Sequence, residues 1–106
     1  MTSTPVAEIL DVRGMINYQE GSIVSRVILK SENGNVTLFA FDAGQELSEH
    51  SAPFDALVEV IEGEAEIRIS GKLSNVKAGE VIIMPADDPH AVKASTRFKM
   101  ILTMIK

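Results

Sequence analysis

Residues 56–70 read ALVEVIEGEAEIRIS, and this stretch decides the fold class. The part before Gly63 is apolar and rich in β-branched residues, and after it Ala65, Ile67 and Ile69 alternate with polar or charged residues. A period of two places apolar side chains on one face of a strand and polar ones on the other. The central glycine and the β-branched residues disfavour one continuous helix. The stretch therefore predicts two strands that meet at Gly63.

The rest of the chain also reads as short strands and turns. Residues 22–30 and 36–41 flank Asn33-Gly34, a pair typical of hairpin turns because both central residues need a positive φ. Further strands are predicted over residues 81–84, 90–94 and 98–105. With no long helix, this pattern predicts an all-β sandwich or barrel.

Length and composition narrow the class of protein. The chain has 106 residues, a net charge of −5 and no cysteine. This length fits one domain, which we place over residues 1–106, with 1–21 as an N-terminal arm or edge strand and 22–106 as the barrel. The absence of a basic patch, a secretory signal and a long apolar run argues against nucleic-acid and membrane partners. We expect a cytoplasmic protein.

Two stretches carry motifs with defined spacings. The first is GQELSEHSAPFDALVEVIEG at residues 44–63, and the second is GEVIIMPADDPHAVKA at residues 79–94. The residues that fit the motifs are Gly44, His50, Gly63, Gly79, Pro85 and His90. Their order and spacing resemble the paired motifs of the cupin superfamily. The resemblance implies a single-domain, antiparallel jelly-roll β-barrel, or double-stranded β-helix, with a pocket that carries both histidines.

Other positions depart from the family pattern. In cupins that bind a metal, three histidines and one glutamate typically converge on one divalent ion. Here Ala52 stands at the second histidine position and Ala56 at the glutamate position. The resemblance therefore implies an incomplete metal set of His50 and His90, with a weakly bound divalent metal ion as the one cofactor to consider. Asp87 replaces a glycine, and we expect its turn to survive because Asp tolerates left-handed backbone better than most residues.

No neighbouring carboxylate is expected to replace the missing ligands. Side chains alternate along a strand, so Glu49 and Glu59 should point away from the pocket. Ser48 should share the side of His50, but a hydroxyl is a poor ligand for a divalent metal. Asp87 lies in a loop and is the one carboxylate that this argument does not exclude.

The pocket is expected to be apolar apart from its histidines. The predicted lining residues are His50, His90, Ala52, Ala56, Val58, Val92, Met100 and Met104. A mostly apolar cavity with a few polar groups is the usual design of a small-molecule site. Methionine thioethers in such a lining would favour soft metals such as Cu(I). We therefore expect a barrel that binds a small-molecule ligand without a tightly bound metal ion.

Two alternatives stay open. His50 and His90 suit acid–base or weak-metal chemistry of the isomerase, lyase or dioxygenase type that occurs in similar barrels. Leu57 and Ile61 should lie on the outward face with Glu59 between them, and exposed apolar residues on a sheet often mark an interface. With the resemblance, this face predicts a homodimer and permits a sensory or interaction module, unless residues 1–21 cover it.

Overall fold

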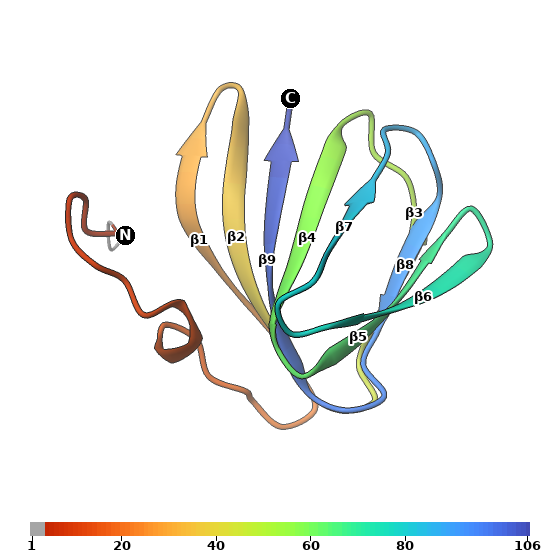
Figure 1. The fold of residues 1–106 in the computed structure, drawn as a ribbon, viewed down its shortest axis with the longest axis horizontal. Coiled ribbons are helices and arrows are strands. Elements are labelled where there is room, and N and C mark those ends of the chain that lie inside the picture. Colours follow the sequence, from red (N-terminus) through yellow and green to blue (C-terminus); the bar gives the residue numbers. More distant parts are fainter. Residues whose placement is uncertain (1–3) are drawn as a thin grey trace.

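Two antiparallel sheets form the barrel in the computed structural model, which describes residues 4–106 (Figure 1). The larger sheet has the order β1-β2-β9-β4-β7, made of β1 (Ile23–Ser31), β2 (Gly34–Phe41), β9 (Phe98–Ile105), β4 (Asp55–Glu62) and β7 (Val81–Met84). The smaller has the order β3-β8-β5-β6, made of β3 (Glu46–His50), β8 (His90–Lys93), β5 (Glu64–Ile69) and β6 (Lys72–Lys77). All pairings are antiparallel, which confirms the predicted all-β jelly-roll barrel.

The order of the strands brings the two motifs together. From β2 onward the chain passes repeatedly between the sheets, so β3 pairs with β8 although about forty residues separate them. This pairing sets His50 opposite His90. The larger sheet, visible at the left and centre of Figure 1, forms the opposite wall of the barrel.

The core lies between the sheets, as the alternation along residues 56–60 predicts. Ala56, Val58 and Val60 are buried, whereas Glu59 is exposed. Phe41 and Phe98 face each other across β2 and β9 with ring centroids 4.6 Å apart. Burial of side chains of this size contributes roughly 1.5–3 kcal/mol each, so the core supplies much of the stability that holds the site in place.

Local turns agree with the sequence in two places and differ in one. Gly63 has φ +78°, and a Cβ there would lie 2.5 Å from the carbonyl oxygen of Arg97, so the junction of β4 and β5 requires glycine. Asp87 adopts φ +69°, which confirms that aspartate maintains the left-handed turn. The first hairpin is present, but Ser31 pairs with Gly34. The turn is therefore centred one residue earlier than predicted, and Gly34 begins β2.

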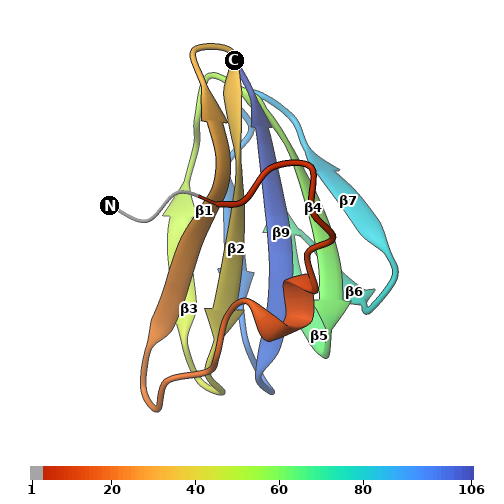
Figure 2. The ribbon, with the colours of Figure 1, turned by 90° about the vertical axis from the view of Figure 1, so that its left-hand side faces the viewer.

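The N-terminal segment covers part of the outer face of the larger sheet (Figure 2). Among its described residues before β1 it forms a short 3-10 helix, η1 (Val12–Gly14), and no strand; we refer to it as the arm. Residues 1–3 of that predicted arm lie outside the described residues. Ile16 is buried against Leu38 and Ala40, with Ile61 beside them. The arm thus covers Ile61, one of the two apolar residues expected on the outward face.

Polar contacts fix the arm to the sheet. The Lys99 ammonium group donates to the carbonyl oxygen of Arg13 at 2.7 Å and lies 3.7 Å from Glu62. The Tyr18 hydroxyl donates to the same Glu62 carboxylate. Burial, followed by this hydrogen bond and the nearby carboxylate charge, raises the pKa of Tyr18. Within residues 4–106, no helix is long and apolar enough to cross a membrane.

Candidate functional site

His50 and His90 meet at one end of a cavity inside the barrel. Their ring centroids are 4.4 Å apart, and their Nε2 atoms are separated by 3.2 Å. His90 begins β8 and is buried, whereas His50 ends β3 and is exposed. The pair therefore lies at the boundary between solvent, to which His50 is exposed, and the barrel interior, in which His90 is buried.

An irregularity in β3 aims His50 into the cavity. Leu47 pairs with Val92 and His50 pairs with His90, so β3 uses one residue more than β8 between these pairs. A bulge of this kind reverses the side to which the following side chains point. Leu47 and His50 consequently line the same cavity, while Ser48 is exposed. The expectation that Ser48 shares the side of His50 is wrong because it assumed an unbroken alternation.

Backbone carbonyl groups fix the tautomers of both rings. Nδ1 of His50 lies 2.8 Å from the carbonyl oxygen of Ser48, and Nδ1 of His90 lies 3.2 Å from that of Asp88. A carbonyl oxygen only accepts hydrogen bonds, so each Nδ1 carries the proton. In the neutral state, both Nε2 atoms then present a lone pair at the cavity. They are two acceptors 3.2 Å apart with no proton between them.

The interior disfavours a positive charge on His90. Burial lowers the pKa of His90, the hydrogen bond to the Asp88 carbonyl opposes this, and the proximity of His50 lowers it again. The lowered pKa favours the neutral ring. A neutral His90 presents its Nε2 atom as a hydrogen-bond acceptor or as a potential ligand for a cation.

The cavity next to the His pair is small and almost entirely apolar. Its volume is about 60 Å³. The residues that line it are Leu47, His50, Ala52, Phe54, Ala56, Met84, His90, Val92, Met100, Leu102 and Met104. All the predicted lining residues except Val58 are among them, because Val58 is fully buried in the core instead.

Some lining residues were missed by the sequence analysis. Leu47 was missed because of the bulge, and Phe54 because it lies in a loop without periodicity. Met84 was assigned to an apolar strand but not to the pocket. Its β7 position pairs with Ala56, a signal that only the strand register provides.

The site does not match the donor set of the family's divalent metal centre. Within residues 4–106, no three His, Cys, Asp or Glu side chains are grouped so that they could hold a metal. Glu49 and Glu59 are exposed, as expected, and neither lines the cavity. Asp87 does not line it either; its N–H donates to the carbonyl oxygen of Ala52 at 2.7 Å. His50 and His90 are thus a two-nitrogen remnant without an oxygen donor in the cavity.

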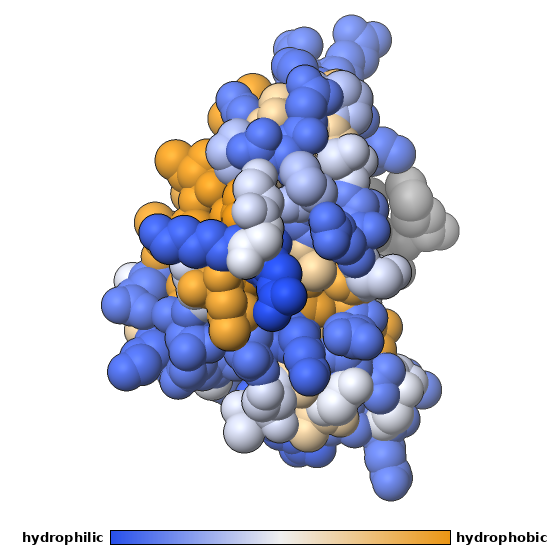
Figure 3. Space-filling view, turned by 90° about the vertical axis from the view of Figure 1, so that its right-hand side faces the viewer, coloured by the Kyte–Doolittle hydropathy of each residue, from blue (hydrophilic) through white to orange (hydrophobic). Residues whose placement is uncertain are grey.

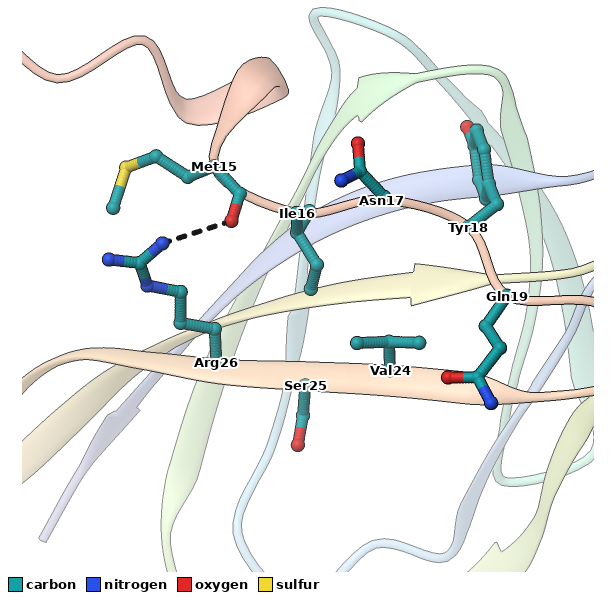
Figure 4. Close-up of a pocket in the computed structure, with 8 residues that line it drawn as sticks. All are labelled: Met15, Ile16, Asn17, Tyr18, Gln19, Val24, Ser25 and Arg26. Carbon is teal, nitrogen blue, oxygen red and sulfur yellow. Dashed lines mark hydrogen bonds between the residues drawn. The ribbon is translucent and has the colours of Figure 1, made fainter. Parts of the chain in front are cut away.

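A larger depression lies on the surface between the arm and β1 (Figure 4). Its volume is about 530 Å³, and its wall includes Met15, Tyr18 and Arg26. The Arg26 guanidinium donates to the Met15 carbonyl oxygen at 3.1 Å. None of its lining residues is a histidine or a carboxylate. Both histidines are in the barrel, where we place the candidate site.

Comparison with known proteins identifies the family. A family model described as a cupin domain matches residues 37–106. A conserved protein of unknown function from Streptococcus pyogenes is 34% identical, with a TM-score of 0.91 and coverage of 100% of this chain and 96% of that chain. A search of curated proteins finds no match. The chain belongs to the cupin family.

Two other solved structures extend the comparison. A cupin 2 conserved barrel domain protein from Leptotrichia buccalis is 40% identical, with a TM-score of 0.88 and coverage of 92% of this chain. The match covers 47% of that protein, so the present chain spans about half its length. A cupin superfamily protein from Desulfitobacterium hafniense is 26% identical, with a TM-score of 0.90 and coverage of 98% of this chain and 95% of that chain.

Proposed function

We propose that this cupin binds a small molecule in its barrel, with His50 and His90 as the polar end of the site and no tightly bound divalent metal ion. One observation carries the proposal. Both Nδ1 atoms are held by backbone carbonyls, so both Nε2 acceptors are directed to one end of an apolar cavity. Fixed polar groups in an otherwise apolar cavity are the usual basis of ligand orientation.

The His pair selects the chemical class of the ligand. Two neutral Nε2 acceptors match a ligand that brings an O–H or N–H donor. They repel a carboxylate, because both partners would then present lone pairs. Leu47, Leu102 and the methionines offer apolar contact to the rest of the molecule. The ligand we propose is therefore a small alcohol or amine with an apolar body.

The volume of the cavity limits the size of what it holds. About 60 Å³ is well below the roughly 300–1,000 Å³ of typical ligand pockets. The cavity admits a ligand of a few heavy atoms, or the terminal group of a longer molecule that extends past the exposed His50. The alanines at positions 52 and 56 create this space, because longer side chains there would fill it.

Binding of matched four-carbon probes tests the proposal. In titrations followed by NMR of ¹⁵N-labelled histidine, n-butanol and n-butylamine are expected to shift the Nε2 resonances at lower concentration than butyrate. His50→Ala and His90→Ala should each weaken butanol binding. The control is Glu49→Gln, because Glu49 is exposed and does not line the cavity. Equal or tighter binding of butyrate, or an affinity for butanol that neither His50→Ala nor His90→Ala changes, would overturn the proposal.

Acid–base catalysis is the second candidate function. It is supported by the same pair, because an imidazole with a lowered pKa is a neutral base near pH 7. A C–H group next to a bound hydroxyl group would lie within reach of Nε2, which would take its proton while the electron pair left behind forms a double bond. Isomerisation, in which the proton returns to an adjacent carbon, or elimination, in which the hydroxyl group leaves with a proton as water, is the reaction class that needs this step. Deuterium exchange into a bound substrate, lost in His90→Gln, is the corresponding test.

A homodimer is also part of the proposal. On the outer face of the larger sheet, away from the buried Ile16, one set of paired residues runs across all five strands, with one residue from each strand. The row consists of Ile83, Leu57, Thr103, Val36 and Leu29. Ile83 and Leu29 are exposed. Figure 3 shows the opposite side of the barrel, where a mostly hydrophilic surface carries apolar side chains at its left edge. We infer that a second copy covers this row. In a two-fold dimer the same patch of each subunit faces its counterpart, so the apolar rows of two copies would pack against each other. A cytoplasmic location stays a prediction from the sequence.

A further inference from the structure

The cavity beside the His pair contains sulfur where the family pattern has oxygen. Met84, Met100 and Met104 line it, and no carboxylate does. In the register of the larger sheet, Ala56 pairs with Met84 on one side and with Met104 on the other. Ala56 is the position at which the family pattern has its glutamate. The space left by the missing carboxylate is therefore flanked by two thioethers.

The geometry of the His pair favours binding of a cation. Two lone pairs that face each other at 3.2 Å repel unless a proton or a metal ion lies between them. Two nitrogens bound to one ion at about 2.0–2.1 Å each and at a tetrahedral angle stand about 3.3 Å apart. The observed Nε2–Nε2 separation of 3.2 Å is close to that value.

The available donors decide which ion this would be. Divalent Mn, Fe and Zn prefer sets that include carboxylates or at least three nitrogen or thiolate ligands. Thioether sulfur is a soft, neutral donor that suits Cu(I), and imidazole accepts copper as well. A monovalent ion is also easier to place in an apolar cavity, since no carboxylate is available to offset a second charge.

We propose that His50, His90, Met84 and Met104 form a Cu(I) site in the barrel. The inference concerns the cavity of the proposed function and rests on the His pair assigned there. The histidines supply two nitrogens from the smaller sheet, and the methionines supply sulfur from the larger sheet. Cu(I) binding and butanol binding are then mutually exclusive, because both use the Nε2 lone pairs.

Anaerobic competition against the Cu(I) chelator bicinchoninic acid tests this site with the intact chain. The wild-type protein is expected to bind one Cu(I) ion, and X-ray absorption should show sulfur as well as nitrogen around the copper. His50→Ala should weaken binding by at least about 100-fold, and Met84→Leu and Met104→Leu by about tenfold each, because each removes a donor atom. Met15→Leu is the matched control, since Met15 lies on the arm outside the cavity.

Leucine keeps the volume and apolarity of methionine, so these variants should fold. The single variants decide the result if the double variant Met84→Leu, Met104→Leu loses thermal stability. Cu(I) binding that both methionine variants leave unchanged, or copper with only nitrogen and oxygen neighbours, would overturn the Cu(I) site. Wild-type protein that binds butanol but takes up no Cu(I) would overturn this inference alone, whereas a failed butanol titration would overturn the proposed function, so the two failures are distinguishable.

Discussion

The Nε2 atoms of His50 and His90 lie 3.2 Å apart, and the backbone carbonyls of Ser48 and Asp88 hold both protons on the opposite ring nitrogens. The hydrogen bonds from the Nδ1 atoms to the backbone thus hold two Nε2 acceptors at contact distance, although these acceptors cannot hydrogen-bond to each other. Such an arrangement is costly unless a ligand donates a proton to it or a cation bridges it. This relationship is the basis of both proposals for the barrel.

The stability of the protein should fall as the pH drops through the range in which histidine titrates. The pKa of His90 is lowered in the folded state, while an unfolded chain has a histidine pKa of about 6.5. Below that value the unfolded state binds more protons than the folded state, so protonation favours unfolding. The contribution is fully present above about pH 6.5 and is lost as the pH falls towards the folded-state pKa.

Urea unfolding of wild type and His90→Gln at about pH 7.5 and pH 5.5 measures this effect. The wild-type midpoint should fall between the two pH values, and the variant should show a smaller fall. Asp42 does not interfere, because its pKa is lowered, chiefly by the hydrogen bond from the Gly21 N–H. An identical pH dependence in both proteins would contradict a buried neutral His90.

Ile16 should be the residue through which the arm stabilises the fold. It is 4% exposed and packs against Leu38 and Ala40. Ile16→Ala is expected to lower the free energy of unfolding by about 2–4 kcal/mol, through lost burial and the cavity left behind. Ile9→Ala is the control: Ile9 is 101% exposed, so its change should stay within about 0.5 kcal/mol. Equal effects would mean that the arm is not packed on the sheet.

Gly63 should tolerate a side chain less well than Gly71. Both have a positive φ, but only at Gly63 would a Cβ meet a backbone atom, the Arg97 carbonyl oxygen at 2.5 Å. Gly71→Ala should cost about 1–2 kcal/mol from the left-handed conformation alone. Gly63→Ala should cost clearly more, because the backbone must also move. The difference between the two unfolding free energies, from denaturant titrations, isolates the steric clash, and a difference near zero would refute it.

The outer row of the larger sheet should govern self-association. Wild-type protein is expected to sediment as a dimer at micromolar concentration. Ile83→Lys should give a monomer, because Ile83 is 62% exposed and a buried, unpaired ammonium group would oppose the interface. Leu73→Lys is the control, since Leu73 is 46% exposed but belongs to β6 in the other sheet. A monomeric wild type, or dissociation by both variants alike, would exclude this interface.

The sequence alone determined the fold class and the identity of the two key residues. Alternation along residues 56–70 predicted strands and an all-β fold, because period is a local property of the chain. The resemblance of the two motifs to those of cupins implied a barrel with His50 and His90 in one pocket. The same analysis predicted that Ala56 faces inward and Glu59 outward. It also predicted the left-handed turn at Asp87, since that preference belongs to the residue itself.

Only the tertiary structure decided what surrounds the histidines. The bulge in β3 directs Leu47 and His50, rather than Ser48, into the cavity. Strand register places Met84 and Met104 on either side of Ala56. A bulge and a register depend on pairing between segments far apart in the sequence, which no local pattern specifies. The sequence could therefore show that a carboxylate is missing, whereas the fold shows that sulfur flanks the place where it would be.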